Sequence, residues 1–188
     1  MNFFQRRGVA LVISALVILG SVSYGSASSL QRAIDNVEAG FYDGVEYDGY
    51  VHKSIASQLQ ARVDNANGIF SITAAYAPEE TEAAREYRAD MYSALQYGYD
   101  ASYLYYLNEE LTTAMTELDK AMASVELPED EQAAYDQYYS DFNAAMNVIA
   151  QSGYNESCRD FQQDVLSRFP AEFIYYNSSS VYGPSLFA

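Results

Sequence analysis

Hydrophobic positions recur every three or four residues along most of this chain, which is the spacing of one face of an α-helix. The clearest run lies at residues 104–125, where each step is 3 or 4: Leu104, Leu107, Leu111, Met115, Leu118, Met122 and Val125. No long segment alternates apolar and polar residues, as a strand with one buried face does. The pattern therefore predicts an all-α fold.

The same spacing predicts four more helical faces. They are Leu30, Ile34, Val37 and Phe41; Ile55, Leu59, Val63, Ala66, Ile69 or Phe70, and Thr73; Ala84, Tyr87, Met91 and Leu95; and Tyr135, Tyr138, Phe142, Met146, Ile149, Gly153, Ser157 or Cys158, Phe161, Val165 and Phe169. We interpret the last set as one long helix that Pro170 ends, with a kink expected at Gly153. Residues 171–188 are apolar but have no period, and we expect them to pack along the helices.

Turn and cap residues separate these faces. Ser54 is expected to cap the helix that follows it, and Pro78 and Pro128 each precede acidic residues that suit the first turn of a helix. Residues 42–50 repeat Tyr-Asp-Gly, which is turn chemistry, so we expect a loop there. Long helices joined by short loops predict an antiparallel helical bundle.

An uncharged segment of 17 residues, 8–24, follows the basic pair Arg6 and Arg7. As a helix it would be about 25 Å long, a little under the ~30 Å thickness of a bilayer core. We favour a transmembrane anchor at residues 1–27 that precedes an extracytoplasmic domain at residues 28–188. The alternative is a signal peptide that is cleaved after Ala27, where small residues precede the cut. Both interpretations leave the N-terminus in the cytoplasm by the positive-inside rule.

The chain is strongly acidic, with 26 Asp and Glu residues against 10 Lys and Arg and a formal charge of −16. Because Arg6 and Arg7 precede the apolar segment, the part beyond it carries 8 basic and 26 acidic residues, a charge of −18. Such a field repels phosphate groups, so we predict no nucleic-acid partner.

Few residues suited to catalysis or metal binding are present. His52 is the single histidine and Cys158 the single cysteine, so a zinc site or a di-metal carboxylate bundle has too few ligands. The sequence also has no Gly-x-Ser-x-Gly elbow and no Gly-rich phosphate loop. We therefore predict a protein that is not an enzyme, with no catalytic, cofactor-binding or metal residues and no cofactor.

One acidic loop offers an alternative. Asp43, Glu46 and Asp48 carry oxygen ligands of the kind that Ca²⁺ prefers, although their spacing departs from that of an EF-hand loop. The runner-up hypothesis is accordingly a cation-binding or small-ligand-binding module.

Tyrosine is abundant, with 19 residues in the chain. A dense group comprises Tyr103, Tyr105, Tyr106, Tyr135, Tyr138 and Tyr139. One interpretation is an aromatic surface that binds a partner, because tyrosine combines a flat apolar ring with a polar hydroxyl. The simpler interpretation divides each cluster between core and rim.

Motifs in the last third of the chain resemble the closing signature of the LemA family. They are Ser-Gly-Tyr-Asn at residues 152–155, Arg-Asp-Phe at 159–161, Val-Leu-Ser-Arg-Phe-Pro-Ala at 165–171 and Pro-Ser-Leu-Phe-Ala at 184–188. An apolar N-terminal helix and a helix over residues 54–76 fit the family as well. The chain departs from it at residues 42–50, where the family usually has a tryptophan, and in its acidity.

The resemblance implies a bacterial, membrane-anchored bundle of the LemA type with no catalytic residues, and it favours retention of the first helix. We expect a docking or scaffold module of the cell envelope. Its partners would be the membrane, through the N-terminal helix, and another envelope protein. An enzyme acting on the envelope ranks last, because it rests only on the expected location.

Overall fold

The computed structural model describes residues 7–47 and 49–188, and the side chains of residues 14, 25–46 and 49–188. The chain forms two compact units. Unit 1 comprises Met1–Glu38 and Arg159–Pro184, and unit 2 comprises Ala39–Cys158 and Ser185–Ala188. The elements are α1 (Arg7–Asp43), β1 (Val45–Tyr47), β2 (Tyr50–His52), α2 (Ile55–Thr73), α3 (Pro78–Tyr97), α4 (Ala101–Met122), α5 (Glu129–Ala150), α6 (Tyr154–Phe161), the π-helical turn η2 (Gln162–Leu166) and α7 (Ala171–Asn177). The protein is mostly helical, as predicted.

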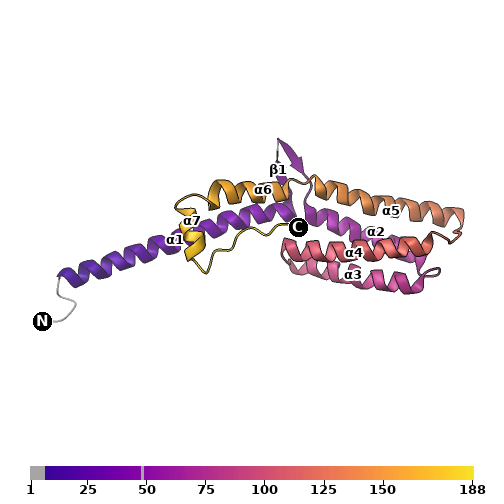
Figure 1. The fold of residues 1–188 in the computed structure, drawn as a ribbon, viewed down its shortest axis with the longest axis horizontal. Coiled ribbons are helices and arrows are strands. Elements are labelled where there is room, and N and C mark those ends of the chain that lie inside the picture. Colours follow the sequence, from indigo (N-terminus) through magenta and orange to yellow (C-terminus); the bar gives the residue numbers. More distant parts are fainter. Residues whose placement is uncertain (1–6, 48) are drawn as a thin grey trace. The chain divides into compact units, whose positions relative to one another are not determined.

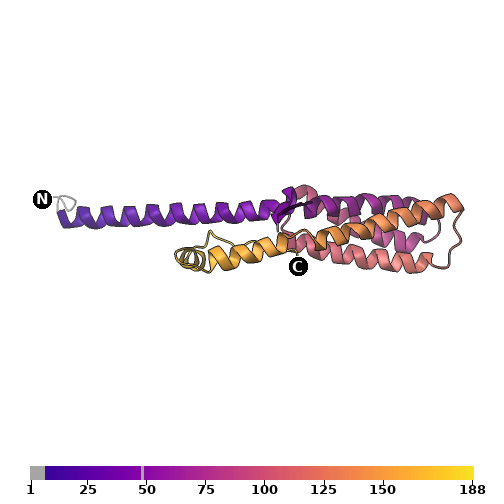
Figure 2. The same cartoon turned by 90° about the horizontal axis from the view of Figure 1, so that it is seen from above.

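Unit 2 contains a bundle of the helices α2 to α5, which lie alongside one another in both views (Figures 1 and 2). Helix α2 packs against α5 and α3, and α3 packs against α4. The predicted faces form its core, which includes Ala66, Ile69, Phe70, Ala77, Ala84, Leu111, Met115, Leu118, Met122, Tyr135 and Phe142. The sequence spacing thus identified which side of each of these helices is buried.

Local chemistry sets the ends of these helices. The Ser54 hydroxyl accepts a hydrogen bond from the Ser57 amide, 3.2 Å away, as expected of an N-cap. Asp100 does the same for α4, accepting from the Tyr103 amide at 2.9 Å. Gly98 ends α3 in the left-handed conformation, with φ of 67°.

Helices α2 and α5 approach closely where Gly68 faces Tyr138. A Cβ atom at position 68 would lie 2.7 Å from the Tyr138 ring, closer than side chains normally pack. Glycine at this position therefore lets the tyrosine ring lie directly on the helix backbone.

The long helix expected between Tyr135 and Phe169 is wrong. Helix α5 ends at Ala150, and Gly153 has a φ of 71°, a left-handed value that no helix residue adopts. The chain restarts as α6 and then passes through η2. The hydrophobic spacing continues across this break, so periodicity alone could not reveal it.

Residues 42–50 also differ from the expected loop. Strands β1 and β2 form an antiparallel hairpin in which Val45 pairs with His52 and Glu46 with Val51. Strands of three residues are too short to produce a recognisable alternation in the sequence.

Unit 1 is built around α1. Its residues Ala27, Leu30 and Ile34 form a buried cluster with Leu166 and Val181. The partly buried residues Phe161, Ala171, Ile174 and Tyr175 pack against this cluster. Residues 171–184 therefore belong to unit 1. We expected the whole segment 171–188 to pack along the bundle, but only residues 185–188 belong to the unit that contains it.

A search of the described residues found no helix that is both long and apolar enough to span a membrane. The predicted anchor at residues 1–27 lies largely outside the described side chains. Within this range, only the side chains of residues 14 and 25–27 are described.

Candidate functional site

The acidic residues of the alternative cation site lie near the hairpin. Asp43 and Glu46 are exposed, and Asp48 lies outside the described residues. Within the described part of the chain, no three His, Cys, Asp or Glu side chains group in a way that would hold a metal ion. His52 is partly buried on β2, and Cys158 is buried in α6, so the structure does not bring the two together in one element.

Three tyrosines form a continuous aromatic patch at the start of α4, which we call the tyrosine surface. Tyr99, Tyr103 and Tyr106 are exposed by 41 to 55%. The ring centroids of Tyr99 and Tyr103 are 5.1 Å apart, and those of Tyr103 and Tyr106 are 6.4 Å apart. Neighbouring rings at these distances are in contact, so the patch presents three aromatic side chains as one exposed surface.

The other predicted tyrosines divide between core and rim, which confirms the simpler interpretation. Tyr138 is exposed, and Tyr105 packs edge-on against Phe187 at 5.2 Å. Tyr135 is buried and donates a hydrogen bond to Asp119, and partly buried Tyr139 donates to the Met115 carbonyl at 3.1 Å. Burial raises the pKa of Tyr139 to about 12, and burial together with the hydrogen bond to Asp119 raises the pKa of Tyr135 as well.

Carboxylates border the tyrosine surface. The Asp100 carboxylate accepts hydrogen bonds from the Ser102 hydroxyl at 2.6 Å and from the Tyr103 amide, which lower its pKa. The charge of Glu110 raises the pKa of Tyr87, and Tyr106 raises it to a smaller extent. An aromatic patch with carboxyl groups at its edge suits a partner that presents Lys or Arg together with apolar side chains.

A buried arginine lies in the core among α2, α4 and α5. Arg62 is 1% exposed, its Nη2 donates to the Thr112 hydroxyl at 2.7 Å, and its guanidinium lies 3.9 Å from the centre of the Phe142 ring. Nε and Nη1 have no hydrogen-bond partner. Burial lowers the pKa of Arg62 to about 10, while the charge of Glu109 acts in the opposite direction.

Asn108 adds a second polar group to this part of the core. Its side-chain nitrogen lies 3.4 Å from the sulfur of Met146, and its Oδ1 has no hydrogen-bond partner. Neither Arg62 nor Asn108 was predicted from the sequence. The available signal was that Arg62 shares a helical face with Leu59, Ala66 and Ile69.

Residues 185–188 lie against α6 and complete another part of unit 2. The Asn155 side chain pairs with the backbone of Phe187, donating to its carbonyl at 2.8 Å and accepting from its amide at 2.9 Å. The Tyr154 hydroxyl donates to the Ser185 carbonyl at 2.7 Å. The Tyr-Asn and Phe-Ala motifs that we compared with the LemA family are therefore in direct contact.

A small cavity of about 210 Å³ adjoins Phe187. It is lined by Ile55, Tyr105, Met146, Ile149, Ala150, Ser152, Asn155, Glu156 and Phe187. The Phe187 ring packs 5.8 Å from the Phe41 ring as well as against Tyr105, so aromatic contacts fix one wall of this cavity.

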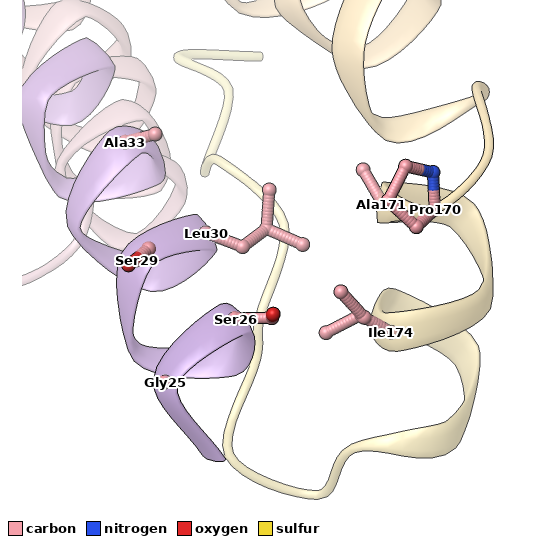
Figure 3. Close-up of a pocket in the computed structure, with 8 residues that line it drawn as sticks. All are labelled: Gly25, Ser26, Ser29, Leu30, Ala33, Pro170, Ala171 and Ile174. Atoms are coloured by element: carbon pink, nitrogen blue, oxygen red, sulfur yellow. The ribbon is translucent and has the colours of Figure 1, made fainter. Parts of the chain in front are cut away.

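Unit 1 has an open groove of about 530 Å³ beside α1 (Figure 3). It is lined by Gly25, Ser26, Ser29, Leu30, Ala33, Pro170, Ala171 and Ile174. Figure 3 shows the side chains of Leu30 and Ile174 pointing toward each other across it. The lining is small and mainly apolar, without a charged side chain.

Comparison with known proteins finds no family model, no curated protein and no solved structure that matches this chain.

Proposed function

We propose that this chain is a membrane-anchored, extracytoplasmic helical-bundle protein of the LemA type, which is not an enzyme and docks another protein of the bacterial envelope. The tyrosine surface carries the docking proposal, because it is an exposed and continuous aromatic patch on a helical framework. Aromatic residues of this kind dominate the energetics of protein interfaces.

The charged groups around the tyrosine surface also indicate which side chains a partner should present. The carboxylates of Asp100 and Glu110 border the patch, so a partner with basic and apolar side chains fits it best. The basic pair and uncharged segment at residues 6–24, together with the LemA-like motifs, support a membrane anchor.

The docking proposal is tested by crosslinking the full-length protein in native membranes and isolating it. We expect a stoichiometric partner that is lost in the double variant Tyr103→Ser, Tyr106→Ser. Each ring contributes contact area, and removing two anchors from one interface typically costs more than 2 kcal/mol, roughly thirtyfold or more in affinity.

The matched control is Tyr50→Ser, which removes an exposed tyrosine from β2. It should leave the crosslinked partner unchanged. Recovery of the same partner at equal yield with the double variant would exclude the tyrosine surface as the docking site.

The anchor is tested separately by extracting membranes with carbonate. A retained anchor keeps the full-length chain in the membrane pellet. Release of a protein that lacks its first 27 residues would show that the segment is a cleaved signal peptide.

A further inference from the structure

Unit 1 exposes large aromatic side chains in a short stretch. Phe169, Phe173, Tyr176 and Tyr182 are exposed by 63 to 83%, and we call them the aromatic surface of unit 1. Phe173 and Tyr176 are three residues apart on α7, so they project from the same side of that helix. Exposing so much ring area to water is unfavourable unless another surface covers it.

Unit 1 and unit 2 differ strongly in net charge. Unit 1 contains five basic and five acidic residues, whereas unit 2 contains five basic and 21 acidic residues, which accounts for the whole formal charge of −16. Beyond the apolar segment, unit 1 still has only three basic and five acidic residues, and residues 173–184 have no charged side chain. The electrostatic repulsion from anionic head groups therefore falls mainly on unit 2.

The segment that carries the aromatic surface packs against the part of α1 that directly follows the apolar segment. Leu30 and Ile34 pack in one cluster with Leu166 and Val181, and Ile174 and Tyr175 lie against it. At about 1.5 Å per residue, Ala27, the first residue of this cluster, lies about 5 Å along the helix from Tyr24, where the apolar segment ends. The head-group region is about 5–7 Å thick on each side of a bilayer core, so this cluster begins at its level.

We propose that the aromatic surface of unit 1 lies in the head-group region of the phospholipid bilayer that holds the N-terminal segment. This proposal rests on the anchoring proposed above. Tyrosine and phenylalanine rings suit this region, because their apolar bodies reach the acyl chains while tyrosine hydroxyls remain hydrated. The groove beside Leu30 and Ile174 presents further apolar surface next to the same cluster.

The absence of tryptophan from the chain allows a direct test, because each introduced tryptophan is the single one in the variant and can be excited at wavelengths that the tyrosines of the chain do not absorb. The full-length variants Phe173→Trp and Tyr176→Trp are inserted into vesicles of phosphatidylcholine and phosphatidylglycerol, in which part of the lipid carries bromine on the acyl chains near the head group. We expect the brominated lipid to quench the emission and the emission maximum to shift to the blue, because a ring in the interfacial region lies close to the bromine atoms and is shielded from water.

The matched control is Tyr97→Trp, at an exposed position in unit 2. Its emission should be the same with and without brominated lipid. Equal quenching of this variant would indicate non-specific adsorption and would overturn the proposal. A blue shift at position 173 or 176 without quenching would also overturn it, since that result means burial in a protein contact such as a second copy.

Flotation of the same vesicles after carbonate treatment separates the two proposals. Protein that leaves the vesicles overturns the anchor and, with it, the membrane contact of unit 1. Protein that floats with the vesicles but shows no quenching at either position leaves the anchor intact and overturns only the interfacial position of the aromatic surface. Circular dichroism of each variant checks that it is folded.

Discussion

Arg62 places a cation among apolar side chains of unit 2 with only part of its hydrogen-bonding capacity satisfied. Its Nη2 donates to Thr112 and its guanidinium carbon lies over the Phe142 ring, but Nε and Nη1 remain without partners. Burying an unpaired donor costs about 1–3 kcal/mol, and a charged donor costs more. The lowered pKa of this guanidinium has the same cause, since burial disfavours its charged form.

Two substitutions at this cluster should have opposite effects. Arg62→Met keeps most of the side-chain volume and removes the buried charge, so we expect the free energy of unfolding to rise by about 1 kcal/mol or more. Thr112→Val removes the one side-chain acceptor of the guanidinium and should lower it by about 1–3 kcal/mol. Urea unfolding followed by circular dichroism measures both.

Thr116→Val is the control for the threonine substitution, because its exposed hydroxyl bonds only to the Thr112 carbonyl in the same helix. It should change stability by less than about 0.5 kcal/mol. If Arg62→Met lowers stability as much as Thr112→Val does, then the stacking on Phe142 outweighs the cost of burial and our account of Arg62 is incorrect.

At the scale of elements, the sequence predicted the helices of the bundle well because their buried faces are continuous. The six apolar positions from Leu104 to Met122 are buried in α4, Val125 is partly buried just after its end, and Ser54 is an N-cap as expected. The break at Gly153 was not predictable from spacing, because Tyr154 and Cys158 continue the hydrophobic period beyond it. Contacts between distant residues, such as Asn155 with Phe187, leave no periodic trace in a sequence.

The candidate sites, too, were predictable where they follow from helical spacing and not where they depend on contacts between distant residues. Tyr106 lies nearly opposite the leucine face of α4 and Tyr103 flanks that face, so the exposure of both was predictable. The inward position of Tyr105 was not, because it depends on the return of Phe187 from another part of the chain. Three members of the aromatic surface of unit 1, Phe173, Tyr176 and Tyr182, escaped prediction because they lie in a segment without any period. Phe169 was expected on the buried face of a long helix but is 83% exposed, because that helix does not form.

The hydrogen bonds between α6 and residues 185–188 should stabilise both the helix and the C-terminal segment. Asn155→Ala removes the two hydrogen bonds to the Phe187 backbone, and we expect a loss of about 1–3 kcal/mol in the free energy of unfolding. Phe187→Ala removes a buried ring and should cost about 3–5 kcal/mol. Hydrogen exchange at the Phe187 amide in the Asn155 variant reports directly on the lost bond.

Asn65→Ala is the matched control, because the Asn65 side chain donates only to the Ala61 carbonyl one turn earlier in its own helix. It should leave exchange at Phe187 unchanged. Unchanged exchange at Phe187 in Asn155→Ala as well would mean that the side chain of Asn155 does not hold the segment in solution.

For the whole molecule, the main asymmetry is electrostatic. Unit 2 carries the entire net charge, with 21 acidic residues against five basic residues, while unit 1 is balanced. Ion pairs such as Lys120 with Glu117 are exposed, so they do little to offset the repulsion among the remaining carboxylates. Self-repulsion of this kind destabilises a compact state, and dissolved salt screens it.

Salt should therefore stabilise the two units unequally. Raising NaCl from about 10 mM to about 150 mM shortens the screening length from about 30 Å to about 8 Å, which is less than the length of one bundle helix. We expect amides in α2 to α5 to gain protection from hydrogen exchange, whereas those at residues 27–34 and 159–181 change little. Sucrose is the control, because it strengthens burial without screening charge and should protect both units alike. Equal gains from NaCl in both units would indicate a general effect on burial and would contradict the role assigned to the acidic surface of unit 2.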